Sequence, residues 1–554
     1  MSNAAAREIA VVIPTWNRSD VAMQAIDAVL AQDAENVSLH LIVVDNASSD
    51  DTFATVWKRF PDADTVTNRS MSSRRIDLLI SRAKQPFQSN GKLASVTLVR
   101  NTANLGGSGG FNAGMAVARD VVCKGSPPFA LWLLDDDACP PPDALRHLIA
   151  ALDSDPNIGL AGSRSVDPRD GPTTGETTLE TTVYFHPSTG HLGNHPEPND
   201  PRRATHDAWV KSLGDCIGKH TYSGIVDTDV CAACSVLARW HAFLKVGLWD
   251  HRFFIYEDDV DFSLRFAEAG YRVVCALDAR VMHLTWHQKL TPTLIAQRLF
   301  YVQRNRTWLL SRHPDPRARA TVKDWLRTTL HHGIIAALHR RGVHGDMLLN
   351  AADAVVNNTG GKLSPWPGSP VPLAKALAET GLMNPTCRVA VVCDRPGFTR
   401  ASAALREQFI THRGGSSGLT WIDCVPSDLQ EPTTTGVQRL IYSRSLRSRL
   451  LRQWPFVLNE PEIVVIFDQA GDFPIMRGSI TLHCSSTDLS SGWVEHHSFW
   501  DRLAAIRRWW SLRRQIPAYL RTVAAGPAIE PTVTVSATPW RSQPISIAHI
   551  PSPL

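Results

Sequence analysis

The sequence predicts an α/β protein in which a mostly parallel sheet flanked by helices is followed by a helical region and a second, smaller α/β module. Three observations lead to this prediction. Apolar strand-like runs alternate with helical patterns from residue 9 to about residue 290, which is typical of parallel strands joined by crossover helices. Apolar residues then recur three or four positions apart from 292 to 358, as they do in helices. After a Pro-rich linker, four further strand-like runs appear at residues 388–393, 419–423, 439–442 and 463–467.

Four strands are expected in the first part of the chain. They are the apolar runs at residues 9–13, 39–44, 95–99 and 129–134. Polar residues follow each run, and Ser19 or Asp20 can cap the helix after the first one. Residues 61–93 are polar and irregular, and an insertion is predicted there.

The rest of the chain divides at changes in composition. Residues 165–228 are rich in Pro, Gly, Thr and His, which predicts loops with a few edge strands. Regular structure is expected again at 230–237, in a helix over 258–269 that Gly270 ends, and in a strand over 271–275. The resulting segments are a first domain at 1–290, a helical region with a linker at 291–384, an α/β module at 385–525 and a Pro/Ser/Thr-rich tail at 526–554.

The bulk composition narrows the class of protein. The 554 residues are 43% hydrophobic and 20% charged, as in globular proteins. The 57 basic and 53 acidic residues leave a formal net charge of +4, which is too small to indicate a nucleic-acid partner. No run reaches the roughly 18 apolar residues of a membrane-spanning helix, and the N-terminus lacks the pattern of a signal peptide. A cytoplasmic protein is therefore expected.

The strongest functional signal is Asp135-Asp136-Asp137, directly after the apolar run at 129–134. Strands of an open α/β sheet present ligand groups at their carboxyl ends. Three adjacent carboxylates repel one another unless a cation lies between them. A hard divalent cation, Mg2+ or Mn2+, fits such oxygen ligands and keeps positions open for phosphates. The alternative is a solvated acidic loop, and the neighbouring motifs favour the metal.

Polar residues also follow the first two predicted strands. The run Pro14-Thr-Trp-Asn-Arg18 comes after the first strand, and Asp45 comes after the second. Amide, guanidinium and carboxylate groups at these positions suit the edge of a base and a ribose. The alternative interpretation is turn chemistry together with a helix cap.

A glycine-rich stretch, Asn104-Leu-Gly-Gly-Ser-Gly-Gly-Phe-Asn-Ala-Gly114, follows the third strand. Glycines at the start of a helix allow the backbone to approach phosphate or sugar closely, and they expose N–H groups. The stretch does not fit G-x-G-x-x-G and does not follow the first strand, which argues against a dinucleotide-binding fold.

A second acidic motif, Glu257-Asp-Asp-Val-Asp261, stands at the start of the helix expected over 258–269. Four carboxylates in five positions exceed what the helix dipole requires. One of them could serve as a general base, with its pKa raised by its neighbours. A neutral imidazole at His283 could complete the metal site, and the alternative is a structural histidine.

Taken together, the order of these motifs resembles that of the family 2 glycosyltransferases with the GT-A fold, over about residues 8–310. Within that family the chain is most similar to bacterial galactofuranosyltransferases, and next to rhamnosyltransferases. Those galactofuranosyltransferases often have Trp at the position of Glu257.

The resemblance implies a role for each motif. Asp259 would be the catalytic base, Asp258 would orient the acceptor or sugar, and the metal ligands would be Asp135, Asp137 and His283. The diphosphate and sugar would face Gly106, Gly107, Gly109 and Gly110. The nucleotide would contact Pro14, Thr15, Asn17, Arg18, Asp45, Arg100, Asn104, Asp135 and Asp136.

The reaction that the resemblance implies is an inverting, metal-dependent hexosyl transfer without a covalent intermediate. The donor would be UDP-galactofuranose, and the acceptor a hydroxyl of a growing, lipid-linked cell-surface glycan. Two alternatives are retained. One is a dTDP-rhamnose-dependent enzyme of the same fold, and the other is a non-catalytic protein that binds nucleotide sugars.

The pair Cys231-Ala-Ala-Cys234 is the only C-x-x-C in the sequence. No second pair or spaced histidine set accompanies it, so two interpretations are retained. They are a zinc or redox site and two small residues on a buried strand.

A basic, Trp-rich run at residues 499–514 predicts an amphipathic helix. One face would carry Phe499, Leu503, Ile506 and Trp510, flanked by arginines. Such a helix contacts an anionic membrane surface, here the inner face of the cell membrane, or packs against another domain with a solvated basic edge.

No motif in the module after residue 385 indicates a family. Asp394, Asp468 and Asp472 follow strand-like runs, but no Gly-rich loop or paired motif accompanies them. An interaction or assembly role is therefore predicted in preference to a second enzymatic activity.

Overall fold

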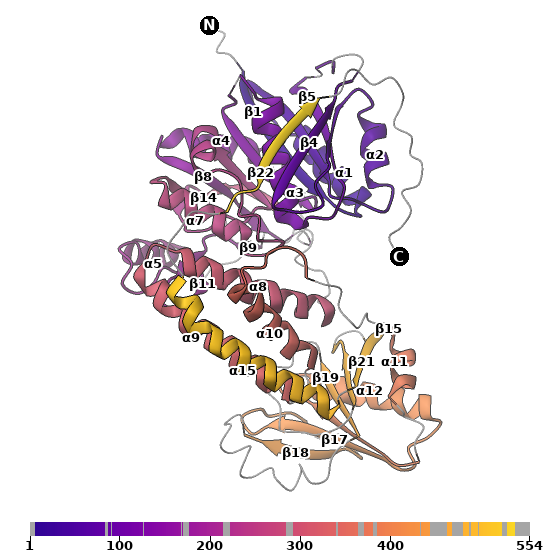
Figure 1. The fold of residues 1–554 in the computed structure, drawn as a ribbon. Coiled ribbons are helices and arrows are strands. Elements are labelled where there is room, and N and C mark those ends of the chain that lie inside the picture. Colours follow the sequence, from indigo (N-terminus) through magenta and orange to yellow (C-terminus); the bar gives the residue numbers. More distant parts are fainter. Residues whose placement is uncertain are drawn as a thin grey trace.

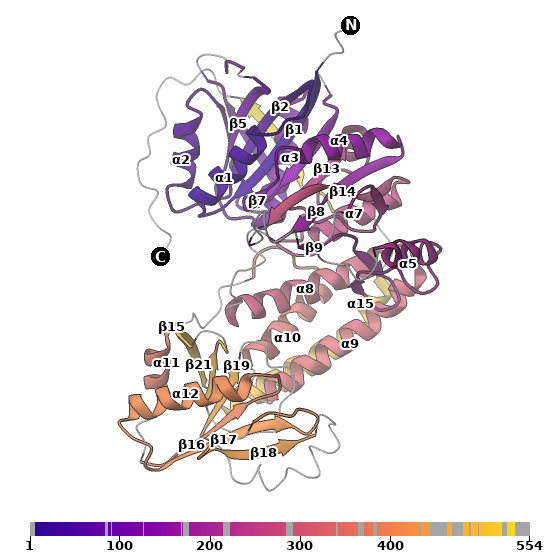
Figure 2. The same cartoon turned by 180° about the vertical axis from the view of Figure 1, so that it is seen from behind.

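The chain forms three parts that follow one another in space (Figure 1): a large sheet with its helices, a helical region, and a smaller α/β module. The same three parts are seen from behind in Figure 2. The computed structural model describes residues 6–83, 87–89, 91–125, 127–167, 169, 177–213, 222–283, 292–338, 342–363, 371–380, 385–432, 434–443, 462–467, 480–486, 489–496, 498–522 and 529–537.

The large sheet has 13 described strands. Two short strands lie off the main order, with β7 (Ala138–Cys139) paired to β14 and β9 (Thr178–Glu180) paired to β8. The main order is β12 (Ile225–Asp227), β14 (Arg272–His283), β8 (Ile158–Val166), β13 (Ser235–Arg239), β6 (Ala130–Leu134), β1 (Arg7–Thr15), β2 (Val37–Asp45), β5 (Leu93–Asn101), β3 (Asp64–Asn68), β4 (Arg75–Ser81) and β22 (Thr532–Ala537).

Six of the ten pairings along this order are parallel, including the continuous run from β6 through β1, β2 and β5 to β3. Strand β13 is antiparallel to both β6 and β8, so it reverses the direction at one point in the sheet. The predicted mostly parallel sheet is therefore confirmed. All four strands expected in the first part of the chain are present as β1, β2, β5 and β6.

Helices cover both faces of this sheet, because its central strands are apolar on both sides. In β1, Ile9, Val11 and Ile13 face one core, while Ala10 and Val12 face the other. The first core also contains residues of α1 (Ser19–Leu30), α2 (Thr52–Arg59) and α4 (Ala144–Ser154). The second contains residues of α3 (Gly106–Val117), α6 (Trp240–Val246) and α7 (Asp258–Glu268).

Two segments are more regular than expected. The insertion predicted over 61–93 contains β3 and β4, which pair antiparallel and extend the sheet. Ile76, Leu78 and Ile80 alternate along β4 and are buried, a period of two that the surrounding polar residues obscure. The loops predicted over 165–228 do contain edge strands, but also helix α5 (Arg203–Ser212) and the hairpin of β10 (Tyr184–His186) and β11 (His191–Gly193).

The helical region predicted from 292 to 358 is present as three helices. They are α8 (Pro292–Arg312), α9 (Pro316–Leu338) and α10 (Gly342–Val356). A fourth helix, α15 (Phe499–Thr522), comes from the far end of the chain and packs on them. Leu512 and Ile516 of α15 share a core with Leu326 and Leu330 of α9. This helix therefore belongs with the helical region and not with the module predicted over 385–525.

The smaller module is a seven-stranded sheet with its own core, and it confirms the four strands expected there. Helix α12 (Phe398–Arg413) lies in front of this sheet in Figure 2, and α11 (Leu373–Glu379) packs on β21. Asp394 is buried, whereas Asp468 and Asp472 lie outside the described residues. The strand order is β15 (Val371–Pro372), β21 (Ser491–His496), β20 (Ile480–Cys484), β19 (Ile463–Phe467), β16 (Cys387–Val392), β17 (Leu419–Pro426) and β18 (Gln438–Tyr442).

The chain finally returns to the large sheet. Residues 532–537, expected to be part of a tail, form β22, and all six pair in parallel with 75–80 of β4. Figure 1 shows this strand, in yellow, beside the indigo strands from the other end of the sequence. No local pattern indicates this pairing, because its two strands are more than 450 residues apart.

Two buried ion pairs join the helical region to the large sheet. Arg306 of α8 donates to Glu257 from Nε at 2.7 Å, and both side chains are 7% exposed. Arg312, at the end of the same helix, pairs with Asp261 of α7. Since a buried carboxylate is costly without a cation, these pairs fix α7 against α8.

Among the described helices, none is both long enough and apolar enough to cross a membrane.

Replacing Arg306 by Met should lower the free energy of unfolding by about 3–5 kcal/mol, because Glu257 would stay buried without its cation. Urea denaturation followed by Trp fluorescence measures the change. The matched control is Arg317→Met, which breaks ion pairs to Asp315 and Glu197 from a half-exposed side chain and should cost less than about 1 kcal/mol. Equal losses in the two variants would contradict a special role for the Glu257–Arg306 pair.

Candidate functional site

Parallel pairing brings the predicted site residues to one edge of the large sheet. Strand β1 pairs with β2 so that Thr15 lies opposite Asp45, and β2 pairs with β5 so that Asp45 lies opposite Arg100. Strand β6 lies on the other side of β1 and ends at Leu134, directly before the three aspartates. The polar residues that follow these strands therefore gather at their common carboxyl edge, as expected for an open α/β sheet.

A short pairing places His283 beside the aspartates. The end of β14 pairs with β7, with His283 opposite Ala138. The Nε2 atom of His283 lies 3.0 Å from Oδ1 of Asp137 and 3.7 Å from Oδ2 of Asp135. One ligand atom from each of these three residues lies within 4.8 Å of the other two. The three side chains singled out as metal ligands thus form one cluster.

The electrostatics of this cluster favour a cation. Burial and the charges of Asp137 and Asp136 raise the pKa of Asp135 to about 7, although His283 opposes the shift. Burial would lower the pKa of His283, but its hydrogen bond to Asp137 and the charge of Asp135 outweigh burial and raise the pKa. Two carboxylates and an imidazole make a donor set that suits Mn2+ or Mg2+. The residues present therefore fit a divalent metal ion.

The middle aspartate has a different environment. Thr15 donates from Oγ1 to Asp136 at 2.8 Å, and Arg18 donates from Nη1 to Asp136 at 3.3 Å and to Asp137 at 3.0 Å. Arg18 therefore lies between two carboxylates of the triad. Both residues were expected to contact a nucleotide, and in the structure their polar side-chain atoms hold the aspartates in place.

Asp45 keeps one oxygen without a hydrogen bond among the described residues, whereas the side chain of Asn17 bonds to a neighbouring loop. The side chain of Asn17 accepts a hydrogen bond from the backbone N–H of Ser49 at 2.7 Å, which ties the loop after β1 to the loop after β2. Asp45 accepts from Ser48 through Oδ1, but its buried Oδ2 has no hydrogen-bond partner among the described residues. The nearest cation to that oxygen is Arg100, at 3.8 Å. Burial raises the pKa of Asp45.

Asn46 organises the glycine-rich loop, and the sequence analysis missed it. Its amide donates to the carbonyl of Gly106 at 2.8 Å and to Asn104 at 3.3 Å. Its side-chain oxygen accepts from Asn101 at 2.9 Å and from the backbone of Leu105 at 3.1 Å. The signal that could have found it is its position directly after Asp45, at the end of a predicted strand.

Three of the four glycines assigned to the diphosphate serve packing. A Cβ on Gly106 would meet the carbonyl of Phe254 at 2.0 Å, and one on Gly110 would meet Pro14 at 2.8 Å. A Cβ on Gly109 would collide with Leu105. Only at Gly107 is there open space, with no atom within 4 Å. Gly106, Gly109 and Gly110 therefore let the backbone pack closely against other parts of the protein. Of the four glycines, only Gly107 has open space beside it.

The acidic motif at 257–261 begins α7, as predicted, and the structure divides its carboxylates into two kinds. Glu257 and Asp261 are held by arginines, namely Arg306 for the first and Arg265 and Arg312 for the second. Asp258 and Asp259 have no ion pair among the described residues. The motif therefore contains two structural and two available carboxylates.

The available pair is linked to the glycine-rich loop. Ser108 donates from Oγ to Oδ2 of Asp258, which connects the start of α3 to the start of α7. Burial and the charges of Asp258 and Glu257 raise the pKa of Asp259 well above its ordinary value. Tyr256 and Glu257 both have left-handed backbone conformations, with φ of 65° and 66°. Such strain in non-glycine residues is typical of functional sites.

Glu180 of β9 is a further carboxylate that the sequence analysis missed. Its charge contributes to the raised pKa values of Asp259 and His283, so it lies near both clusters. Burial raises its own pKa. No sequence signal indicates it, since it lies in the Pro- and Gly-rich segment.

The cysteine pair has the properties of a buried structural element. Cys231 and Cys234 are free and buried just before β13, and burial raises the pKa of each thiol. Cys231 donates from Sγ to the carbonyl of Val274 at 3.3 Å. Neither cysteine is part of a potential metal-binding group among the described residues.

A comparison with protein-family models identifies a family for this chain. The model of a family described as "Glycosyltransferase like family 2" matches residues 6–308, which is more than half of the chain. No curated protein sequence matches significantly.

Three solved structures are similar over part of the chain. The mannosyltransferase PcManGT from Pyrobaculum calidifontis in complex with GDP-Man and Mn2+ is 15% identical, over 64% of this chain and 88% of that chain, with a TM-score of 0.34. S. aureus TarS 1-349 in complex with UDP-GlcNAc is 12% identical, over 63% and 81%, with a TM-score of 0.36. GalNAc-T7 with UDP, GalNAc and Mn2+ is 14% identical, over 51% and 44%, with a TM-score of 0.34.

Removing a ligand from the cluster should weaken metal binding. Asp135→Asn and His283→Ala are each expected to raise the dissociation constant for Mn2+ by about 10- to 100-fold. Isothermal titration calorimetry with MnCl2 measures this without any reaction. Asp153→Asn, an exposed aspartate of α4 paired with Arg7, is the control and should bind Mn2+ as the unchanged protein does. Unaltered Mn2+ binding in both ligand variants would mean that the ion is held elsewhere.

Proposed function

Because the chain belongs to the glycosyltransferase-like family 2, we propose that it is an inverting, metal-dependent hexosyltransferase that moves galactofuranose from UDP-galactofuranose onto a hydroxyl of a glycan. At the level of the family, the chain is a glycosyltransferase that uses a nucleotide-sugar donor. The sugar, the linkage and the acceptor belong to the proposal. The acceptor is a growing, lipid-linked cell-surface glycan.

The observation that supports the proposal most is the meeting of two carboxylate clusters. The charge of Asp258 contributes to the raised pKa of Asp135, so the start of α7 and the predicted metal ligands belong to one site. A protein that only binds a nucleotide sugar needs ligands for the diphosphate, but it has no need for a second carboxylate pair beside them. This favours catalysis over the binding-only alternative.

Asp259 acts as the general base. Its raised pKa makes the carboxylate a better proton acceptor than an exposed aspartate, so it can take the proton of an acceptor hydroxyl as that oxygen attacks the anomeric carbon. The attack comes from the face opposite the leaving UDP, which inverts the configuration. Asp258, fixed by Ser108, orients the acceptor or the sugar.

The remaining residues bind the donor. Asp45, whose Oδ2 accepts no hydrogen bond among the described residues, is the proposed acceptor for the uridine, and Gly107 leaves room for the diphosphate beside the start of α3. Thr15 and Arg18 keep Asp136 and Asp137 in position. A divalent ion held by Asp135, Asp137 and His283 would neutralise the charge that develops on the leaving diphosphate.

A peripheral membrane contact would bring the enzyme to a lipid-linked acceptor. The exposed side of α15 carries Trp500 and Trp510, which are 70% and 50% exposed. Exposed arginines on the same helix include Arg507, Arg513 and Arg514. Tryptophan and arginine side chains together favour the surface of an anionic membrane.

Donor choice can be tested by measuring nucleotide release in the presence of a crude lipid-linked glycan fraction. The donors are UDP-galactofuranose, UDP-galactopyranose, UDP-glucose and dTDP-rhamnose, each with and without Mn2+. Release of UDP from the furanose donor, dependent on Mn2+, is expected. Asp259→Asn should lower kcat by about 10²- to 10⁴-fold while UDP still binds, because only the proton transfer is lost.

Two results would count against parts of the proposal. Turnover of dTDP-rhamnose in place of UDP-galactofuranose would keep the mechanism and overturn the sugar. Normal UDP binding without release from any donor would favour a binding protein. Asp153→Asn is again the control, since this exposed aspartate lies outside the site.

The pH dependence of kcat should reflect the pKa of Asp259, which depends on the charge of Asp258. The base must be deprotonated, so kcat should rise with pH through the raised pKa of Asp259. Asp258→Asn removes a neighbouring negative charge and should lower that pKa, which moves the acidic limb of the kcat profile to lower pH. The position of the limb can be read even if the variant is slow. A limb that stays in place would show that another group limits the rate.

A further inference from the structure

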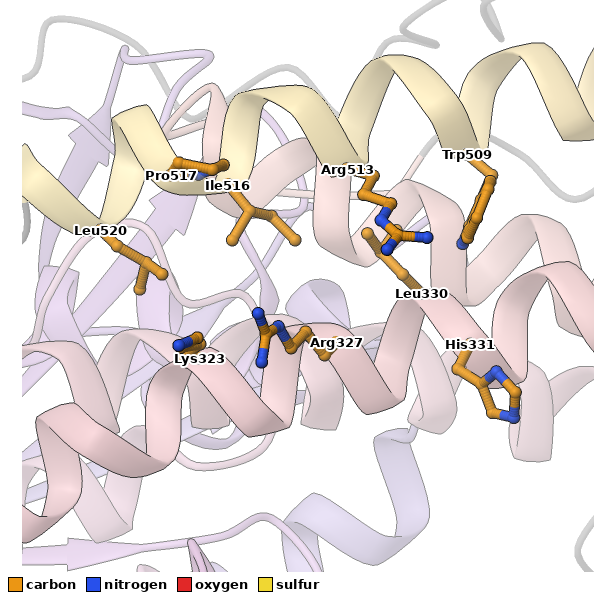
Figure 3. Close-up of a pocket in the computed structure, with 9 residues that line it drawn as sticks. All are labelled: Lys323, Arg327, Leu330, His331, Trp509, Arg513, Ile516, Pro517 and Leu520. Atoms are coloured by element: carbon orange, nitrogen blue, oxygen red, sulfur yellow. The ribbon is translucent and has the colours of Figure 1, made fainter.

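A groove of about 780 Å3 runs between α9 and α15 (Figure 3), and neither the predicted metal ligands nor Asp259 line it. It forms where a helix from the end of the chain is laid against a helix nearly 200 residues earlier. Its lining residues are Lys323, Arg327, Leu330 and His331 of α9 and Trp509, Arg513, Ile516, Pro517 and Leu520 of α15.

The lining combines an apolar surface with basic groups. Leu330 and Ile516 are buried, and they belong to the core that α15 shares with the helical region. Lys323, Arg327 and Arg513 are exposed, and Figure 3 shows them along the two sides of the groove. None of the nine lining residues is a carboxylate. The groove therefore favours a ligand that is both apolar and anionic.

The two helices are well packed elsewhere, so the groove is not a sign of missing structure. Ala505, Leu512 and Ile516 pack α15 onto the helical region, and Tyr519 hydrogen-bonds Ser311 of α8 at 2.9 Å. Packing is thus one of the two roles that the sequence predicted for this helix. Pro517 stands inside α15 and has no N–H, so one helical hydrogen bond is missing beside the groove.

The other side of α9 has a different character. A hollow of about 670 Å3 there is lined by Asp324, Thr328 and Gln303 as well as by Arg317 and Trp325. Unlike the groove, this hollow includes a carboxylate. The absence of a carboxylate from the lining is therefore a property of the groove and not of every hollow along α9.

The neighbourhood of the groove points to a membrane as the source of the ligand. Trp510 is half exposed next to Trp509, and Arg513 lies over both rings at 5.8 and 5.1 Å. Arg514 lies over Trp510 at 5.9 Å. Indole rings and guanidinium groups in this combination suit the headgroup region of an anionic bilayer.

We propose that the groove binds one anionic phospholipid of the membrane surface. The phosphate lies among Lys323, Arg327 and Arg513, and the acyl chains begin along Leu330, Ile516 and Leu520. This site deepens the peripheral membrane contact proposed above and rests on that proposal. The peripheral contact alone requires only a general electrostatic attraction, whereas this proposal specifies one lipid-binding site between two helices.

A soluble lipid tests the groove without a membrane and without the transfer reaction. Dihexanoyl-phosphatidylglycerol, below its critical micelle concentration, is titrated into the full-length protein by calorimetry. One binding site is expected. Dihexanoyl-phosphatidylcholine, which has no net charge, and glycerol phosphate, which has no chains, should each bind at least about tenfold more weakly.

Charge reversal separates the groove from the rest of the surface. Arg327→Glu and Arg513→Glu should each weaken binding of the anionic lipid by about tenfold or more. Arg400→Glu makes the same change on an exposed residue of α12 and should have no effect. Circular dichroism checks that each variant folds. Because the donor assay does not depend on this lipid, loss of lipid binding with normal UDP release would leave the proposed activity intact.

Vesicle flotation distinguishes the groove from the exposed tryptophans. With phosphatidylglycerol vesicles, both groove variants should bind less than the unchanged protein. Binding that is lost in a Trp500→Ser/Trp510→Ser variant but unchanged in both arginine variants would overturn the groove and keep a general surface contact. Equal binding of the neutral and anionic short-chain lipids, or no binding of either, would also overturn the proposed site.

Discussion

The buried ion pairs between α7 and α8 are the constraint on which the site depends. Glu257 and Asp261 flank the two available carboxylates, and each is neutralised by an arginine of α8. Without those arginines, Glu257 would be buried without a cation and Asp261 would keep only Arg265 of its own helix, and an unpaired buried ion costs several kcal/mol. The position of Asp258 and Asp259 therefore depends on residues about 50 positions later in the chain. The sheet and the helical region form one functional unit for this reason.

At the carboxyl edge of the sheet, aspartates are likewise stabilised by neighbouring cationic and polar side chains. Three adjacent aspartates follow β6, and each has a different combination of neighbours. Asp136 is held by Thr15 and Arg18, Asp137 lies between Arg18 and His283, and Asp135 is left with a pKa raised to about 7. Arg18 therefore neutralises Asp136 and part of the charge of Asp137, but not that of Asp135. A divalent ion bound beside His283 would supply the remaining positive charge. Charge balance at this edge thus explains both the ordered aspartates and the metal that they fit.

The end of the chain links all three parts of the molecule. After the smaller sheet, α15 packs on the helical region, and β22 then joins the edge of the large sheet. A segment that returns in this way limits how far the smaller module can move from the large sheet. It also creates surfaces that no single part has, since the groove between α9 and α15 needs both helices. The smaller module is therefore followed in the chain by a helix that packs on the helical region and by a strand of the large sheet.

Sequence patterns were sufficient to predict the features that depend on residues close together in the chain. Strand–helix alternation predicted β1, β2, β5 and β6. Asp135 and Asp137 after β6, together with His283, were expected as metal ligands, and the acidic motif at 257–261 was expected at the start of a helix. It did not predict the pairing of β3 with β4, the return of β22, or the roles of Asn46 and Glu180. Nor could it tell which carboxylates of 257–261 are structural, because the arginines that decide this lie on another helix. Local patterns report the period of burial along one segment, whereas ion pairs and strand neighbours join distant segments and arise only when the chain is folded.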